Sequence, residues 1–303
     1  MDKSSLGDFA SPIATPTSPE QRSRWQEANR TWWENNPMQY DWRDGLEHEK
    51  FSEAYYREID ARFFSSTRSI MPWQSIPFDN LIPFAHLQDK KCLEIGVGCG
   101  THAQLIAQHA GEFTGIDLTE HAVHCTRSRM ELSGIRAQIL RMDAEEMTFP
   151  DQSFDFVWSW GVIHHSADTP KVLSEIHRVL KPGGKAHIMV YYRNYWNYYI
   201  IAGLFFGILK GNLFRTGSLT KTQQLATDGA LARYYTIPEW RALVEPGFAV
   251  DEVQIFGLKP EILPMPAGRA KNFLLAVIPD ALARFFVHRC KMGSFLVSKL
   301  TRR

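Results

Sequence analysis

The chain has 303 residues, of which 44% are hydrophobic, and this composition is sufficient for a sizeable buried core. The 34 basic and 33 acidic residues nearly balance, so the chain lacks the overall basic character that nucleic-acid-binding domains usually show. No apolar stretch reaches the roughly 20 residues needed to cross a bilayer, and we expect no signal peptide in the polar N-terminus. The four cysteines have no C-x-x-C spacing, and we expect reduced thiols in a cytoplasmic protein.

The N-terminal part of the chain divides into two segments of different composition. Residues 1–23 are dominated by Ser, Thr and Pro, which predicts a disordered tail because such a segment has little apolar surface to bury. Residues 24–89 follow a helical pattern that prolines interrupt, and this predicts a helical appendage of short helices and loops. The appendage is rich in aromatic residues, among them Trp32, Trp33 and Tyr40.

A regular alternation of strand-like and helix-like patterns begins near residue 90 and continues to residue 192. Such alternation is typical of βαβ units and predicts an α/β, Rossmann-like, doubly wound and mostly parallel sheet. The C-terminal segment, residues 250–303, is expected to complete this sheet with two further strands and a helix. The seven expected strands are residues 92–95, 113–116, 137–140, 154–158, 186–191, 250–255 and 293–298, and the main expected helices are residues 103–108, 120–132 and 170–180.

Residues 193–249 interrupt the alternation and are expected to form an inserted cap. The most apolar run of the chain, residues 198–209, lies at the start of this insertion. It suits either a buried cap helix or an element lying on a membrane surface, and the basic and apolar segment 271–291 suits a membrane surface as well. Peripheral membrane contact is therefore left open beside a purely cytoplasmic location.

A glycine-rich turn, residues 94–100, leaves the first strand of the alternating region. Its glycines at positions 96, 98 and 100 let the backbone approach a ligand closely. A dinucleotide site would need a glycine where Thr101 stands, and a P-loop would need a Gly-Lys-Ser/Thr sequence that does not follow. The turn therefore favours a ligand without pyrophosphate and disfavours a nicotinamide-dependent oxidoreductase.

Two acidic residues come after successive strands that follow the glycine turn. Asp117 ends the second expected strand, and Asp143 follows the third. At the carboxyl edge of a doubly wound sheet, such an acid can accept hydrogen bonds from both hydroxyl groups of a ribose. The second acid can accept a hydrogen bond from an adenine amino group. Together with the turn, these residues indicate a nucleoside ligand at this edge.

Six motifs in register extend this pattern over about residues 90–192. They are residues 93–100, 115–119, 141–145, 149–155, 161–165 and 175–184. In these motifs the chain resembles the class I S-adenosylmethionine (SAM)-dependent methyltransferases, in the branch similar to the ubiquinone/menaquinone-biosynthesis methyltransferases. The resemblance implies SAM as the cofactor and methyl transfer as the reaction. It does not identify the acceptor, because the flanking segments match the quinone enzymes poorly.

The resemblance also implies roles for residues of the core. Glu94 would orient the methionyl amine of SAM, the glycine backbone would pass along the cofactor, and Asp117 would hold the ribose. The cofactor-binding residues implied in this way are Glu94, Gly96, Gly98, Gly100, Asp117, Leu118, Asp143, Ala144 and Trp160.

His164 and His165 follow the fourth strand, near the expected position of the methyl group. Either could act as a general base for an acceptor that must lose a proton, and they are our candidate catalytic residues. The alternative is that they cap the next helix or pack beside the cofactor. The candidate acceptor-binding residues are aromatic and come from the appendage and the cap: Trp32, Trp33, Tyr40, Tyr192, Tyr195 and Tyr234.

The sequence therefore predicts a SAM-dependent methyltransferase that acts on a small-molecule or lipid-like acceptor by in-line displacement. The chemistry requires no metal, and we expect no metal site. The alternative is a non-catalytic SAM-binding module that recruits a partner through its aromatic appendage. Nucleic acid is not the expected acceptor, because no Asn-Pro-Pro-Tyr/Phe-type sequence follows the fourth strand, where residues 159–162 read Ser-Trp-Gly-Val. The oligomeric state is left open.

Overall fold

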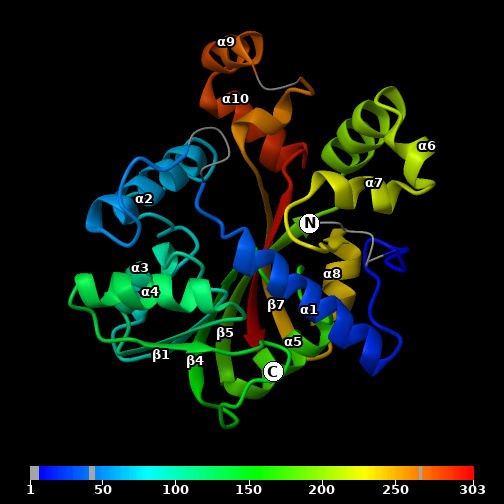
Figure 1. Cartoon of the computed structure of the whole chain (residues 1–303). Helices are drawn as coiled ribbons and strands as arrows, with labels where there is room; N and C mark the ends of the chain where they lie inside the picture. The colour runs from blue at the N-terminus through cyan, green and yellow to red at the C-terminus, as the bar shows by residue number, and fades with distance from the viewer. Residues whose placement is uncertain (1–6, 41–44, 266–267) are drawn as a thin grey trace.

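A twisted β-sheet with helices against both faces forms the centre of the molecule (Figure 1). The computed structural model describes residues 7–40, 45–265 and 268–303. The strand order is β3-β2-β1-β4-β5-β8-β7, and a short strand, β6, pairs with β5 outside this path. The strands are β1 (Lys91–Ile95), β2 (Glu112–Asp117), β3 (Gln138–Arg141), β4 (Phe154–Trp160), β5 (Leu180–Tyr192), β6 (Tyr234–Tyr235), β7 (Phe248–Phe256) and β8 (Phe295–Arg302).

The strand directions follow the expected doubly wound pattern. All pairs among β1 to β6 are parallel, whereas β8 runs antiparallel to both β5 and β7. The Rossmann-like, mostly parallel fold is therefore confirmed, and the seven expected strands correspond to β1–β5, β7 and β8. The short strand β6 is an addition that the sequence pattern does not predict.

Side chains of the central strands alternate between two hydrophobic clusters, as the period of a strand requires. In β4, Val157 packs with α5 (Thr169–Val179) and α8 (Ile237–Val244) on one face. Its neighbours Phe156 and Trp158 pack with α3 (Thr101–Ala107) and α4 (Glu120–Leu132) on the other face. Because both faces are covered, the central strands read as nearly continuous apolar runs.

Local sequence signals determine where the helices begin. Thr119 accepts a hydrogen bond from the backbone N–H of Ala122 and so caps α4, which confirms the helix expected over residues 120–132. Thr236 and Glu239 form a reciprocal capping box at the start of α8. Helix α8 therefore begins immediately after β6, with Thr236 as the only residue between them.

The N-terminal appendage contains α1 (Pro19–Asn35), α2 (Glu53–Arg68) and the 3-10 turn η2 (Phe84–His86). Helix α1 lies against α4, and α2 lies against α3 and α4. An ion pair between Asp60 of α2, which is partly exposed, and the buried Arg129 of α4, 2.5 Å apart, ties the appendage to the core. Helices therefore form in this segment as expected, although the boundaries of the five predicted segments of the chain stay predictions.

Residues 7–23 differ from the disordered tail that the sequence predicts, while residues 1–6 lie outside the described residues. Phe9 is buried and packs edge-on against Trp25 of α1. The guanidinium of Arg233 lies over both rings and donates to the carbonyl oxygens of Ala14, Ser166 and Ala167. Phe9 and the buried Arg233 thus hold residues 7–23 in place, and the polar composition of this segment does not reveal these contacts.

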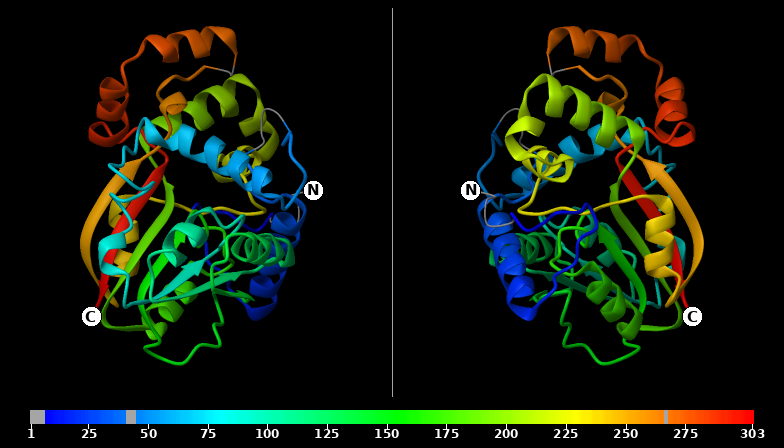
Figure 2. Two further views of the ribbon diagram at one scale, coloured as in Figure 1. Left: turned by 90° about the vertical axis from the view of Figure 1, so that its left-hand side faces the viewer. Right: turned by 90° about the vertical axis from the view of Figure 1, so that its right-hand side faces the viewer.

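Two helical segments project from the sheet at the same end of the molecule in both views of Figure 2. The first follows β5 and contains η3 (Tyr195–Leu209), which is a π-helix, α6 (Asn212–Thr216) and α7 (Leu219–Ala226). The second lies between β7 and β8 and contains η4 (Lys259–Ile262), α9 (Arg269–Val277), α10 (Asp280–Arg284) and the π-turn η5 (Phe285–Arg289). Among the described residues, no helix has the length and apolar character required to cross a membrane.

We expect Arg233→Met to lower the free energy of unfolding by about 3 kcal/mol, because three carbonyl acceptors lose a charged donor in a buried environment. Urea unfolding of the full chain measures this loss, and limited proteolysis should show faster cleavage before residue 19. The exposed Arg136→Met is the matched control. Equal stability of the two variants would contradict the bridging role of Arg233.

Candidate functional site

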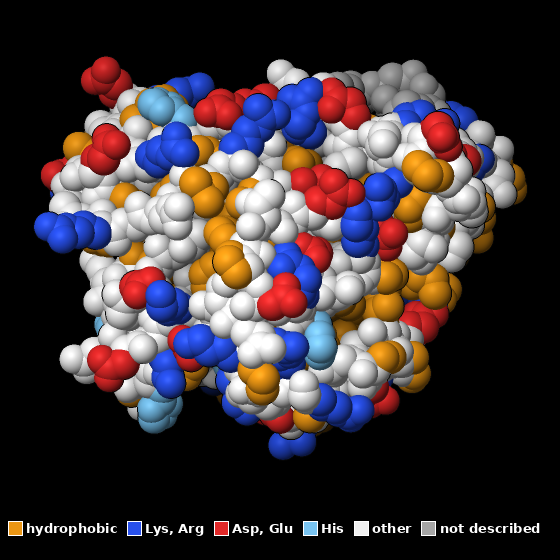
Figure 3. Space-filling view, turned by 90° about the horizontal axis from the view of Figure 1, so that it is seen from below, with side chains coloured by type: hydrophobic (Ala, Val, Ile, Leu, Met, Phe, Trp, Pro, Cys, Tyr) orange, Lys and Arg blue, Asp and Glu red, His pale blue; other side chains and the backbone are white. Residues whose placement is uncertain are grey.

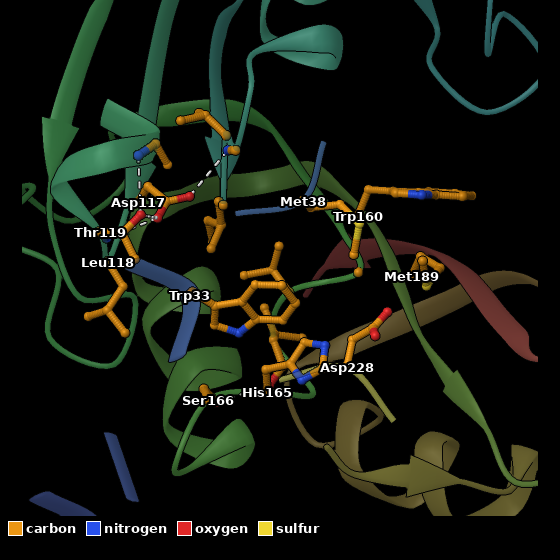
Figure 4. A pocket seen from close by; sticks show the side chains of 18 of the residues that line it. Trp33, Met38, Asp117, Leu118, Thr119, Trp160, His165, Ser166, Met189 and Asp228 are labelled. Carbon is orange, nitrogen blue, oxygen red and sulfur yellow. Dashed lines mark hydrogen bonds between the residues drawn. The ribbon is translucent and has the colours of Figure 1, made fainter. Parts of the chain in front are cut away.

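One cavity of about 470 Å³ opens at the carboxyl ends of β1, β2, β4 and β5 (Figure 4). Its polar part is lined by the glycine turn and by residues after β2 and β3, whereas its other part is lined mainly by aromatic and apolar side chains. The residues from the core include Glu94, Gly96, Gly98, His102, Asp117, Leu118, Asp143, Ala144, Trp160 and His165. Those from the appendage and the cap include Gln26, Trp33, Met38, Tyr40, Phe63, Asp228 and Tyr234, and the C-terminal segment adds Leu258.

The glycine turn combines close packing with an open backbone. A Cβ on Gly96, where φ is +80°, would lie 2.2 Å from the side chain of Val162, so this position excludes a larger residue. A Cβ on Gly98 would instead have no atom within 4 Å. Since Gly98 lines the cavity, its backbone is accessible to a ligand that lies along the turn.

Side chains from α4 and α2 hold the turn from behind. Thr126 donates a hydrogen bond to the carbonyl of Gly98, and Arg129 donates to the carbonyl of Cys99. Arg129 is almost fully buried and also binds Asp60. The turn is therefore preorganised by groups that do not themselves have to contact the ligand.

Glu94 is the buried acid at the base of the turn. Its Oε2 atom has no hydrogen-bond partner within the described part of the chain, and burial raises the pKa of Glu94 well above its usual value. Its Oε1 atom lies 3.9 Å from Nδ1 of His102, but burial and the charge of Arg129 lower the pKa of His102 to about 3. The imidazole is therefore neutral, and a cationic ligand group would satisfy Glu94. This unpaired acid, beside the open backbone of Gly98, fits the amino group and elongated shape of SAM.

The two acids, one at the end of β2 and one after β3, line the cavity as expected. Asp117 accepts hydrogen bonds from the N–H groups of Gly98 and Thr119 and from the Thr119 hydroxyl. Burial raises the pKa of Asp117, and these donors oppose the rise. Asp143 accepts two hydrogen bonds from the side-chain amide of Gln26, so helix α1 reaches the edge where an adenine is expected.

The two candidate catalytic histidines differ in position. His164 is fully buried, packs on Tyr191 with ring centroids 4.0 Å apart, and does not line this cavity. Burial lowers its pKa well below the usual value, and neither ring nitrogen has a hydrogen-bond partner among the described residues. His165 does line the cavity, and its Nδ1 atom is 2.7 Å from the carbonyl oxygen of Leu231. Because a carbonyl only accepts, Nδ1 carries a proton, and Nε2 is the nitrogen that can exchange one.

Four of the predicted aromatic residues line the cavity: Trp33, Tyr40, Trp160 and Tyr234. In Figure 4, Trp33 lies between Asp117 and His165, and its ring centroid is 5.0 Å from that of His165.

The remaining predicted residues lie elsewhere. Trp32 packs beside Phe9 and Trp25, Tyr192 packs in the core on the α5 side of the sheet, and Tyr195 is half exposed. Gly100 caps α3 without lining the cavity, so its contribution is to the shape of the turn.

Several lining residues escape the sequence analysis. His102 stands one residue into α3, among the aromatic rings of Phe63, Phe78 and Trp158. Phe295 reaches the cavity because β8 pairs with β5 in a register that places it beside Tyr191. Asp228, on the loop after α7, also lines the cavity. His102 could have been predicted to line the cavity, because it lies two residues after the glycine turn in the sequence. The position of Phe295 could not, because it depends on the pairing of distant strands.

Comparison with known proteins is informative for the core. Residues 93–188 match a family model described as a methyltransferase domain. The chain is 39% identical over 105 residues to phosphoethanolamine N-methyltransferase 2 of Caenorhabditis elegans, covering 34% of this chain and 24% of that protein. It is 35% identical over 101 residues to a phthiotriol/phenolphthiotriol dimycocerosates methyltransferase of Mycobacterium leprae, covering 33% and 37%. It is also 34% identical over 112 residues to a ubiquinone biosynthesis O-methyltransferase of Pseudomonas aeruginosa, covering 36% and 48%.

Solved structures agree on the fold. One match is to a complex of the Haloferax volcanii Trm112 methyltransferase activator and a candidate methyltransferase, with a TM-score of 0.53 and 19% identity over 84% of this chain and 98% of that chain. Another is a candidate methyltransferase of Bacillus halodurans, with a TM-score of 0.50 and 20% identity over 74% and 97%. The chain spans about a quarter to a half of the length of these curated relatives, and the similarity lies in the cofactor-binding core.

We expect Glu94→Gln to stabilise the ligand-free protein more at pH 8 than at pH 5. The raised pKa of Glu94 means that the folded protein retains a proton that the unfolded chain releases above its usual value of 4.5. The wild-type carboxyl therefore reduces stability as the pH rises, whereas glutamine does not titrate. Thermal unfolding at both pH values, with the exposed Glu131→Gln as the control, measures the effect. A Tm difference that is independent of pH would contradict the assignment.

Proposed function

We propose that this chain, whose residues 93–188 match a methyltransferase domain model, is an enzyme that transfers a methyl group from SAM to a small apolar or lipid-like acceptor. The observation that carries the proposal is one continuous cavity, in which the nucleoside-type groups and an aromatic wall face the same space. The aromatic wall, which is continuous with the polar part, would accommodate an acceptor with a ring or an aliphatic chain.

The polar part of the cavity holds the donor. Bound SAM supplies a methyl group on a sulfonium, so the chain has to position the acceptor in line and exclude water. The carboxylate of Glu94 would accept a hydrogen bond from the amino group, and that of Asp117 would accept from the ribose. Asp143 would turn toward the adenine if Gln26 released it, or Gln26 would itself contribute to the adenine edge.

The aromatic part orients the acceptor. Trp33 and Tyr40 come from the appendage, Trp160 ends β4, and Tyr234 lies in β6. Their rings offer apolar surface, while the hydroxyl of Tyr234 accepts a hydrogen bond from Gln223. The appendage and the cap would shield an acceptor in this part from water.

His165 is our candidate for a group that removes a proton from the acceptor. Nδ1 donates its proton to the carbonyl of Leu231, so Nε2 is the ring nitrogen that would receive a proton from a hydroxyl, amine or activated carbon. His164 would instead have a structural role, because its ring packs against that of Tyr191.

The alternative, a non-catalytic module that recruits a partner through aromatic residues of the appendage, is less well supported. Trp25 is buried against Phe9, and Trp33 and Tyr40 face the cavity. Residues 41–44 of the aromatic run lie outside the described residues.

We expect SAM to bind the wild-type chain and Asp117→Ala to weaken binding by about 10- to 100-fold, because hydrogen bonds to a charged group contribute about 1.5–3 kcal/mol. Titration calorimetry measures the affinity. Incubation with methyl-labelled SAM and fractionated lipid and metabolite extracts then shows whether a label is transferred. Asp151→Ala, on an exposed turn, is the control. SAM binding without transfer to any fraction would favour the non-catalytic alternative.

We expect His165→Asn to lower turnover at saturating acceptor by about 10²- to 10⁴-fold, the usual contribution of a general base. The asparagine amide can still donate to the carbonyl of Leu231, so the local structure should persist. His164→Phe should leave turnover within about threefold, because its ring packs without hydrogen bonds among the described residues. Unchanged turnover of His165→Asn, with an unchanged pH profile, would remove the proton-transfer role.

A further inference from the structure

Exposed apolar side chains gather on two helical segments at one end of the molecule. Of the fifteen large hydrophobic side chains that are exposed in the described residues, twelve lie in η3–α6 and in α9–η5. The most exposed include Leu209, Phe214, Phe273 and Val277, whose relative exposures range from 60% to 77%. So large a group of apolar side chains on the surface indicates an interaction surface rather than isolated exceptions.

The two segments form one structural unit. Trp196, at the start of η3, packs in the same hydrophobic cluster as Leu275 of α9 and Val287 of η5. The carboxylate of Glu261 accepts hydrogen bonds from Asn197 of η3 and from the backbone of Ser294. Figure 2 shows the two segments at the same end of the molecule in both views. We call the exposed surface of residues 195–221 and 268–291 the docking end.

The docking end is basic, although the chain as a whole is nearly neutral. Residues 195–221 contain three basic residues and no acidic residue, and residues 268–291 contain five basic residues and one acidic residue. The acidic residue, Asp280, is paired with Lys259. The exposed cations of this surface are Lys210, Arg215, Arg269, Arg289 and Lys291.

The lower end of the molecule has a different character. Viewed from below, basic and acidic side chains are interspersed over that face (Figure 3). The excess of positive charge beside exposed aromatic and aliphatic groups is therefore a local property of the docking end. Two copies of the chain meeting at this surface would bring like charges together, which argues against a homodimer.

We propose that the docking end binds the surface of an anionic lipid bilayer, with its apolar side chains in the interface and its cations at the headgroups. Lipid interfaces accept basic, apolar helices of this kind, and each cation near an anionic surface contributes to the affinity. Neither segment spans the bilayer; both lie on it. This proposal concerns membrane contact and holds whether or not the chain transfers methyl groups.

If the proposed function holds, binding of the docking end to a membrane would also bring the cavity close to acceptors dissolved in the lipid. The cavity is lined by Ala226 and Asp228, after η3–α6, and by Leu258, before η4. The elements that contact the lipid are thus continuous in the chain with the walls of the aromatic part. An apolar acceptor dissolved in the membrane would have a short path to the methyl donor.

Co-sedimentation of the full chain with vesicles tests the proposal. We expect binding to vesicles of phosphatidylcholine with 30% phosphatidylglycerol, and at least ~10-fold weaker binding to phosphatidylcholine alone, because several cations face the surface. Binding to the anionic vesicles should also fall by at least ~10-fold when the salt concentration is raised to 0.5 M. Absence of binding to anionic vesicles at low salt would overturn the proposal.

Variants locate the contact. Phe214→Ser with Phe273→Ser, and separately Arg269→Gln with Arg289→Gln, should each weaken vesicle binding by about 10-fold or more. Leu132→Ser and Arg136→Gln, exposed residues of α4 and of the loop after it, are the matched controls and should bind as the wild type does. Circular dichroism and SAM affinity, unchanged in all variants, separate loss of docking from loss of fold.

Two outcomes would assign the surface to another occupant. If the docking-end variants bind vesicles as well as the controls do, the contact lies elsewhere and the proposal is overturned. If the wild type does not bind vesicles but sediments as a dimer, and Phe214→Ser with Phe273→Ser converts it to a monomer, the surface joins two copies of the chain. Failure of methyl transfer with intact vesicle binding would count against the proposed function and leave the membrane contact standing.

Discussion

The parallel arrangement of β1, β2, β3 and β4 is the constraint on which the site depends, because it brings the carboxyl ends of these strands to one edge of the sheet. The glycine turn after β1, Asp117 at the end of β2, Asp143 after β3 and Trp160 at the end of β4 therefore face a common cavity. Residues that are up to 66 positions apart in the chain, from Glu94 to Trp160, therefore meet there. The antiparallel strand β8 then adds Phe295 to the same edge.

The polar part of this edge contains a buried acid that lowers the stability of the ligand-free protein and favours the binding of a ligand. Glu94 is buried without a cationic partner, since the neighbouring His102 is neutral. The turn cannot relax around it, because Val162 packs against Gly96 on one side and Arg129 supports Cys99 on the other. A bound ligand with an amino group would satisfy the acid that the protein itself leaves unsatisfied, and binding and stability would be linked.

The segments outside the core give the cavity its apolar character. The appendage contributes Trp33 and Tyr40, and the cap contributes Tyr234. Arg233 connects these two segments, because it belongs to the cap and its guanidinium lies over the ring of Trp25 in the appendage. It also donates to the carbonyl of Ala14 near the N-terminus and to carbonyls that follow the pair of histidines. The same cation thus supports the appendage, the cap and the loop that carries His165. Changes in these flanking segments would alter the acceptor site while leaving the donor site intact.

Local patterns in the sequence were sufficient to predict the fold of the core and the class of ligand that it binds. The spacing of glycines and acids, and the alternation of strands and helices, indicate the Rossmann-like fold and the cofactor edge, because parallel connectivity alone places those residues together. The helix over residues 120–132 follows from the capping Thr119.

Tertiary structure alone decided which flanking residues reach the cavity. Trp33 lines it and the adjacent Trp32 does not, because successive residues point to different sides of α1. His165 lines it and His164 is buried under Tyr191, and Phe295 arrives through pairing of β8 with β5. The placement of residues 7–23 depends on Arg233, more than 200 positions away. Contacts between segments so distant in the chain leave no periodic trace in either one, so only the folded molecule could determine them.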